Sequence, residues 1–228
     1  MKKYILDKKL KKLSSVIDLL LLDNNDSVAM IHNLRKKTRE LLSLVATSDP
    51  FYPKLKKVIK LSNKIRDIDV FLYTFIESLK SIHKKSLDTN RIILISKNSR
   101  NKLFNQLYLY LKKLEIPADI KYKHTVFNIE NTTLLENKPI ILEQKTLHKY
   151  RIKIKQIIYS LKNNKEKEKI SILTTLKDLL GKINDNYNGL KRLQKLNIED
   201  KLFKDIEKYI MKRNNKNFNK VQELNRLL

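Results

Sequence analysis

The segment IHNLRKKTRELLSLV, residues 31–45, has a counterpart 116 residues later in LHKYRIKIKQIIYSL, residues 147–161. Both copies carry an apolar or small residue at every third or fourth position, and these positions coincide when the two are aligned. That spacing places the apolar residues along one side of an α-helix. The two segments are therefore predicted to be equivalent helices of an internal repeat.

A row of basic residues follows the same register in both copies. The shift aligns His32 with His148, Arg35 with Arg151, and Arg39 with Lys155. The spacing i, i+3, i+7 brings each set of three onto one helix face. We expect each row to lie roughly opposite the centre of the apolar side, so that each helix packs with one side and presents cations on the other.

A second repeat follows with a shift of 118 residues. It aligns the apolar residues Leu55, Val58, Leu61 and Ile65 with Leu173, Leu176, Leu179 and Ile183. It also aligns Lys64 with Lys182 and Asp67 with Asp185. The difference of two residues between the shifts indicates a small insertion in the loop that joins the repeated helices.

In order, the four motifs are His-x-x-Arg-x-x-x-Arg at 32–39, Arg-Asp-x-Asp-Val at 66–70, His-x-x-Arg-x-x-x-Lys at 148–155, and Leu-Gly-x-x-Asn-Asp at 180–185. This order resembles the CHAD domain, the conserved-histidine α-helical domain. The resemblance covers nearly the whole chain, most clearly 28–76 and 145–190. It implies two pseudo-symmetric helical bundles with a basic groove or pore that binds inorganic polyphosphate.

The resemblance and the basic rows together define a predicted binding set. Its members are His32, Arg35, Lys36, Arg39, Lys64, Arg66, His148, Arg151, Lys155 and Lys182. Arginine forms forked, charge-assisted bonds to phosphate oxygens, lysine supplies mobile charge, and histidine adds an N–H donor. Asp67 and Asp185 cannot favour a polyanion, so we expect them to orient neighbouring cations.

Some positions depart from the family pattern. Glu40 and Gln156 stand where the basic cluster usually continues, and Asn63 stands where the second copy has Gly181. These departures bear on the local geometry of the basic groove more than on the fold.

The predicted fold class is all-α. Only 2 Gly and 4 Pro interrupt the chain, which favours long helices. Helices are expected at 4–22, 28–47, 54–83, 98–114, 143–162, 169–196 and 199–227. The apolar run Ile92–Ile95 and the even apolar spacing within 118–142 favour short strands in 92–142, with an irregular connector as the alternative. We expect one domain, 1–228, with repeat halves at about 24–118 and 140–228.

Charge points to an anionic partner. The chain has 50 Lys+Arg against 24 Asp+Glu, a formal net charge of +26, and a compact fold with that charge repels itself. Lysine runs such as 8–12 are expected to be solvated faces that add long-range attraction. The leading ligand is inorganic polyphosphate; the alternative is a nucleic-acid-binding or nucleoid-associated protein, although the basic rows lack interleaved aromatics. A scaffold for acidic protein surfaces is a third interpretation.

Catalytic interpretations find little support. There is no Cys, no Gly-rich phosphate loop, no His-Glu-x-x-His and no nucleophile elbow. Asp67 and Asp69 are spaced i, i+2 on a predicted helix and point apart, which disfavours a shared Mg²⁺. We therefore expect a non-enzymatic protein without cofactor or metal. Since no transmembrane or signal segment is visible, we expect a cytoplasmic protein, with polyphosphate granules as a candidate location.

Overall fold

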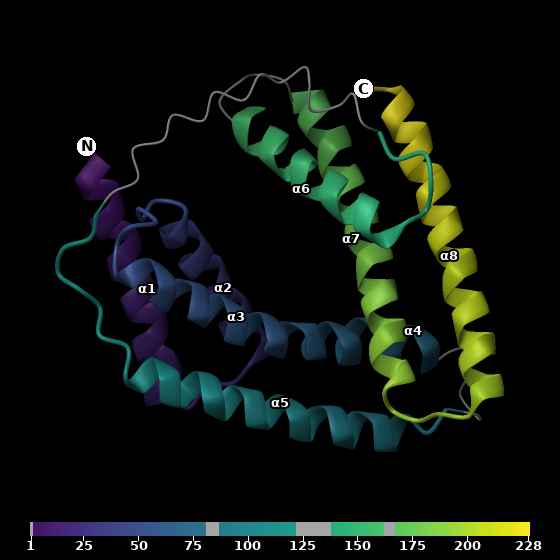
Figure 1. Ribbon diagram of the computed structural model, residues 1–228, viewed down its shortest axis with the longest axis horizontal. Helices are drawn as coiled ribbons and strands as arrows, with labels where there is room; N and C mark the ends of the chain where they lie inside the picture. Colours follow the sequence, from purple (N-terminus) through teal and green to yellow (C-terminus); the bar gives the residue numbers. More distant parts are fainter. Residues whose placement is uncertain (1, 81–86, 122–137, 162–166) are drawn as a thin grey trace. The chain divides into compact units, whose positions relative to one another are not determined.

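The computed structural model describes residues 2–80, 87–121, 138–161 and 167–228, without the side chains of residues 2, 3, 159 and 160. The regular elements in these ranges are all helices, which confirms the all-α prediction (Figure 1). The described residues form two compact units. The first contains 2–74 and 88–121, and the second contains 75–80, 87, 138–161 and 167–228. The proposed repeat halves of a single domain, 24–118 and 140–228, stay a prediction.

The first unit is a bundle of four long helices. They are α1 (Lys2–Leu22), α2 (Val28–Leu42), α3 (Phe51–Val70) and α5 (Thr89–Lys112). Each packs on two others: α1 and α3 flank α2, and α5 contacts both α1 and α3. Leucine, isoleucine, valine and phenylalanine fill the space between them, as the helical periodicity predicts.

The second unit is built around α7 (Lys167–Gln194). This helix contacts both α6 (Gln144–Leu161) and α8 (Asp200–Arg226), which Figure 1 shows in green and yellow. Their apolar sides meet in a core of leucine, isoleucine, valine and tyrosine side chains. The chain leaves α3 through a π-helical turn, Phe71–Ile76, and a short helix α4 (Glu77–Lys80).

The helix boundaries follow local chemistry. Ser27 caps α2 by accepting a hydrogen bond from the Met30 N–H at 3.2 Å, as the polar stretch before it predicted. The second predicted helix, 28–47, ends at Leu42. Asp49 then accepts from the Phe51 N–H and the Lys121 N–H, each at 2.7 Å, so one carboxylate both starts α3 and fixes the end of a later segment.

The predicted strand at Ile92–Ile95 is wrong, because these residues lie inside α5. Asp88 accepts from the Arg91 N–H at 3.0 Å and starts this helix earlier than the predicted residue 98. Only Ile92 in the run is buried, whereas Leu94 is 61% exposed. The apolar run is thus one turn of an amphipathic helix. The other residues for which strands were considered have no strand where they are described, at 113–121 and 138–142, and 122–137 lie outside the described residues.

A third repeated pair of helices appears in the structure. The buried residues of α5 are Ile92, Ser96, Arg100, Phe104, Leu107 and Leu111, and those of α8 are Ile206, Ile210, Asn214, Phe218, Val221 and Asn225. A shift of 114 residues superimposes all of them. Helices α2, α3 and α5 of the first unit therefore correspond in sequence to α6, α7 and α8 of the second.

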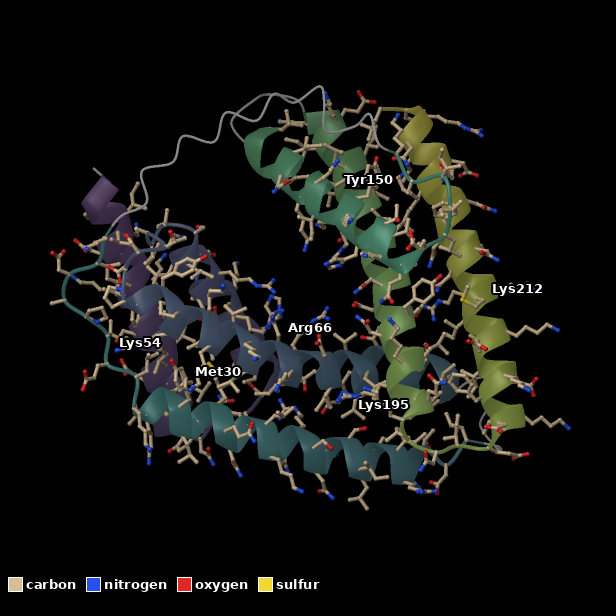
Figure 2. All side chains as sticks on the ribbon, in the orientation of Figure 1. Met30, Lys54, Arg66, Tyr150, Lys195 and Lys212 are labelled. Atoms are coloured by element: carbon tan, nitrogen blue, oxygen red, sulfur yellow. The ribbon has the colours of Figure 1, made fainter. Side chains whose placement is uncertain are left out.

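Polar side chains occupy part of the second core. The Tyr150 hydroxyl donates to Asn225 Oδ1 at 2.8 Å, and Asn186 donates to Asn214 at 2.7 Å. Burial raises the pKa of Tyr150, labelled on α6 in Figure 2, to about 12. These bonds fix the register of α8 because a one-turn slip would leave buried polar groups without partners.

Gly189 allows close packing within the second unit. A Cβ atom at this position would lie 2.2 Å from a ring carbon of Phe75. Replacing Gly189 by alanine is expected to destabilise the protein by about 1–3 kcal/mol, since a ring packed against backbone moves only at a cost. Chemical denaturation of the variant against Gly181→Ala checks this. At position 181 the atoms nearest to the new Cβ belong to the flexible end of Arg151, so equal losses for both would contradict the packing argument.

Candidate polyanion-binding site

The basic row of α2 does not lie opposite the apolar side, as the sequence had suggested. Arg35 is only 9% exposed, and it borders the buried positions Ile31 and Thr38. At about 100° per residue, the row is centred about 110° from the middle of the apolar side. His32 and Arg39 remain exposed. The row therefore flanks the core, and one of its arginines points into the contact between α2 and α3.

Asn63 on α3 joins two of these arginines. Its Oδ1 accepts from Arg35 Nε at 2.9 Å and from Arg39 Nη2 at 3.2 Å. Among the residues that the structure describes, neither guanidinium has an ion pair with a carboxylate. Two positive groups thus converge on one neutral oxygen, one from the buried Arg35 and one from the exposed Arg39.

The electrostatics of Arg35 reflect this crowding. The pKa of Arg35 is lowered to about 10, first by burial and then by the positive charges of Arg39 and Arg66, while Asp67 and Asp69 act in the opposite sense. Arg35 stays charged at neutral pH, but its charge is stabilised less in the free protein than that of an exposed arginine. A bound anion would reverse that effect.

The other predicted binding residues of the first unit differ in their exposure to solvent. His32, Lys36 and Lys64 are exposed. Arg66, labelled on α3 in Figure 2, is partly buried, and its Nη1 lies 3.5 Å from Asp67 Oδ1. The Asp67 side chain is 59% exposed, so the contact between Asp67 and Arg66 lies at the protein surface.

The second unit arranges its equivalent arginine differently. Arg151 Nε donates to the backbone carbonyl of Lys177 at 3.0 Å. Its guanidinium lies on Gly181, where a Cβ would come within 2.9 Å of Nη2. Gly181 aligns with Asn63, so each arginine packs against the equivalent position of the facing helix. In the first unit Asn63 accepts a hydrogen bond from the arginine, and in the second unit Gly181 leaves room for the guanidinium.

The remaining predicted residues of the second unit are accessible. His148 and Lys182 are exposed, and Lys155 and Asp185 are half-buried. The prediction that His32 and His148 face one shared surface concerns the placement of the two units, and it stays a prediction.

Glu40 interrupts the basic row for a structural reason. Its carboxylate forms a hydrogen-bonded ion pair with Lys9 of α1. The hydrogen bond from Lys9 keeps the pKa of Glu40 below its ordinary value. Glu40 thus ties α1 to α2 and neutralises one lysine of the N-terminal run.

A buried ion network that no sequence spacing indicated lies next to the site. Arg100 Nε lies 2.5 Å from Asp69 Oδ1, and Nη1 lies 2.7 Å from Asp26 Oδ2. Burial raises the pKa of Asp69, although Arg100 opposes that shift. Burial also lowers the pKa of Arg100, but the hydrogen bonds and charges of its two partners outweigh burial and raise it. The network joins α5 to α3 and to the start of α2, the two helices that carry the basic cluster.

Asp67 and Asp69 separate as their spacing predicts. Asp67 reaches solvent, whereas the Asp69 side chain is 3% exposed and paired with Arg100. Within the described parts of the chain, no three metal-ligating side chains gather into a cluster. No helix among the described residues has the length and apolar content needed to cross a membrane.

Comparisons with known proteins give one structural likeness. No protein-family model matches the sequence, and no curated protein matches it. The fold is similar to the solved structure of PptA from Streptomyces chartreusis, with a TM-score of 0.64 over 96% of this chain and 95% of that one. The two sequences are 11% identical, so the likeness concerns the fold alone. It supports the CHAD-like fold that the order of the motifs predicted.

Proposed function

We propose that this protein is a non-enzymatic binder of inorganic polyphosphate, which it holds through one set of basic residues in each unit. The first set is His32, Arg35, Lys36, Arg39, Lys64 and Arg66, and the second is His148, Arg151, Lys155 and Lys182. Asp67 orients Arg66, and Asp185 orients a neighbouring cation of the second unit, where Asn184 takes the place of Arg66.

One observation carries the proposal. Arg35 and Arg39 converge on a neutral amide oxygen at 2.9 and 3.2 Å, and neither is paired with a carboxylate among the described residues. Such an arrangement leaves charge to be neutralised by a ligand. Phosphate oxygens suit it because guanidinium groups form paired, charge-assisted bonds with them.

The chemistry of the ligand follows from what accompanies the cations. Polyphosphate carries negative charge on every phosphate and has no bases, so rows of cations suffice to bind it. The tyrosines that approach lysines in the first unit lie elsewhere: Lys57 Nζ is 4.5 Å from the ring centre of Tyr110, and Lys112 is 5.1 Å from that of Tyr108. Neither of these tyrosines offers the basic set a ring on which a base could stack, which favours polyphosphate over nucleic acid. Nucleic acid remains the alternative ligand, and a binding competition decides between the two.

A binder of this kind would be found where polyphosphate accumulates. The cytoplasm, and polyphosphate granules within it, are part of the proposal. Fluorescence microscopy of the tagged protein in cells with and without polyphosphate tests this part separately.

The proposal predicts a steep dependence on salt. Each phosphate contacted should release counterions, so the logarithm of affinity should fall with the logarithm of salt concentration with a slope of about −0.7 per contact, the single-strand value. Titration of long-chain polyphosphate into the protein at several salt concentrations measures that slope. Saturable binding with a slope steeper than about −3 is expected. Absence of saturable binding at physiological salt would refute the proposal.

A further inference from the structure

The two basic sets differ in the kind of cation they offer. Arg35, Arg39 and Arg66 align with Arg151, Lys155 and Asn184 under the two repeat shifts. The first unit therefore has three guanidinium groups where the second has one. Arginine presents a rigid fork of donors, whereas lysine presents a single mobile charge. The same register thus gives unequal phosphate-binding capacity.

The position of Asn63 adds to this difference. By accepting from both Arg35 and Arg39, it holds two guanidinium groups side by side before any ligand arrives. At Gly181 there is no side chain to do this, and Arg151 donates instead to a backbone carbonyl at 3.0 Å. Guanidinium groups that are already held side by side lose less conformational entropy when they bind a ligand.

We propose that the first unit carries the dominant phosphate clamp, formed by Arg35, Arg39 and Arg66, and that Asn63 is its positioning residue. The inference rests on the proposed function and deepens it. A short polyphosphate should need only this clamp, while a long chain also engages the second set. The site would therefore recognise a run of few phosphates as its minimal ligand.

The minimal ligand can be tested with inorganic tripolyphosphate. Arg35→Ala and Arg151→Ala remove the same group from equivalent positions, so they form a matched pair. Calorimetric titration should show a loss of roughly tenfold or more for Arg35→Ala and less than about threefold for Arg151→Ala. Equal losses of affinity in the two variants would show that the first unit does not carry the dominant clamp.

The role of Asn63 is tested by two substitutions: Asn63→Asp adds a negative charge, and Asn63→Ala removes the amide group. In Asn63→Asp a carboxylate would pair with both arginines, so affinity for tripolyphosphate should fall about tenfold and the salt slope should become shallower by roughly one unit. The melting temperature of the free protein should rise by about 2–4 °C, because the buried cation gains a counter-charge. Asn219→Asp, at an exposed position on α8, is the charge-matched control.

Asn63→Ala separates positioning from charge. All the cations remain, so the salt slope should stay unchanged while affinity falls about fivefold through lost ordering. Circular dichroism checks that each variant is folded. If Asn63→Asp binds tripolyphosphate as Asn219→Asp does, Asn63 has no positioning role.

The failures of the two proposals are distinguishable. If the unaltered protein binds long-chain polyphosphate but not tripolyphosphate, the minimal clamp is wrong and the proposed function stands. If it binds neither, the proposed function itself fails.

Discussion

Replacing Arg35 and Arg151 together by alanine is expected to weaken binding of long-chain polyphosphate by roughly 100-fold. Each arginine supplies charge-assisted hydrogen bonds that contribute about 1.5–3 kcal/mol when the partner is ionised. The salt slope should also become shallower by roughly one unit. Calorimetric titration at two or more salt concentrations measures both effects.

The control for this pair removes two lysines from the same protein. Lys8 and Lys12 lie one turn apart on α1 and are exposed, whereas Lys9 between them is paired with Glu40 and is unsuitable. Removing Lys8 and Lys12 should mainly slow association, because distant charges act through the screened field of the protein. If this double variant loses as much affinity as Arg35→Ala with Arg151→Ala, binding is diffuse and the assigned site is wrong.

Replacing Arg100 by methionine is expected to cost about 3–5 kcal/mol of folding stability. The Arg100 side chain is 7% exposed, and the variant would leave the buried carboxylate of Asp69 without its partner. Loss of α5 packing should also disturb α3, which carries Asn63 and Arg66. Denaturant unfolding measures the free energy, and tripolyphosphate titration measures the effect on the clamp.

Two further variants make this result specific. Arg91→Met changes an exposed arginine of the same helix and should cost less than about 0.5 kcal/mol. Asp69→Leu combined with Arg100→Met removes both buried charges, and it should be more stable than Arg100→Met alone. An Arg100→Met variant as stable as Arg91→Met would show that the network does not support the fold.

The sequence predicted the repeated helices because their apolar spacing is regular in both copies. The third pair escaped notice since only two of its six aligned buried positions, Ile92 with Ile206 and Phe104 with Phe218, keep their residue type. Elsewhere the type changes, as from Arg100 to Asn214. The apolar run at Ile92–Ile95 resembled a strand because four residues are too few to show a helical period. The residue that indicates a helix is Asp88, which caps α5 and precedes the apolar run.

The geometry around the predicted binding residues could be predicted only in part. The spacing of His32, Arg35 and Arg39 correctly placed them on one side of α2, but it could not show how far the neighbouring helix covers that side. Asn63 was visible as a departure from the glycine of the second copy. Its role depends on a contact between two helices, which no spacing within one helix reveals. The pairing of Asp69 with Arg100 was hidden for the same reason.

The proposed function requires that the basic sets bind a chain of phosphates and do not read bases. Its most direct test is competition at physiological salt, with labelled long-chain polyphosphate displaced by unlabelled polyphosphate, single-stranded RNA or duplex DNA at equal phosphate concentration. The proposed site predicts that polyphosphate displaces the label at concentrations at least about tenfold lower than either nucleic acid, since the cations act without stacking platforms. Displacement by RNA or DNA at equal or lower concentration would contradict the claim and identify a nucleic-acid-binding protein.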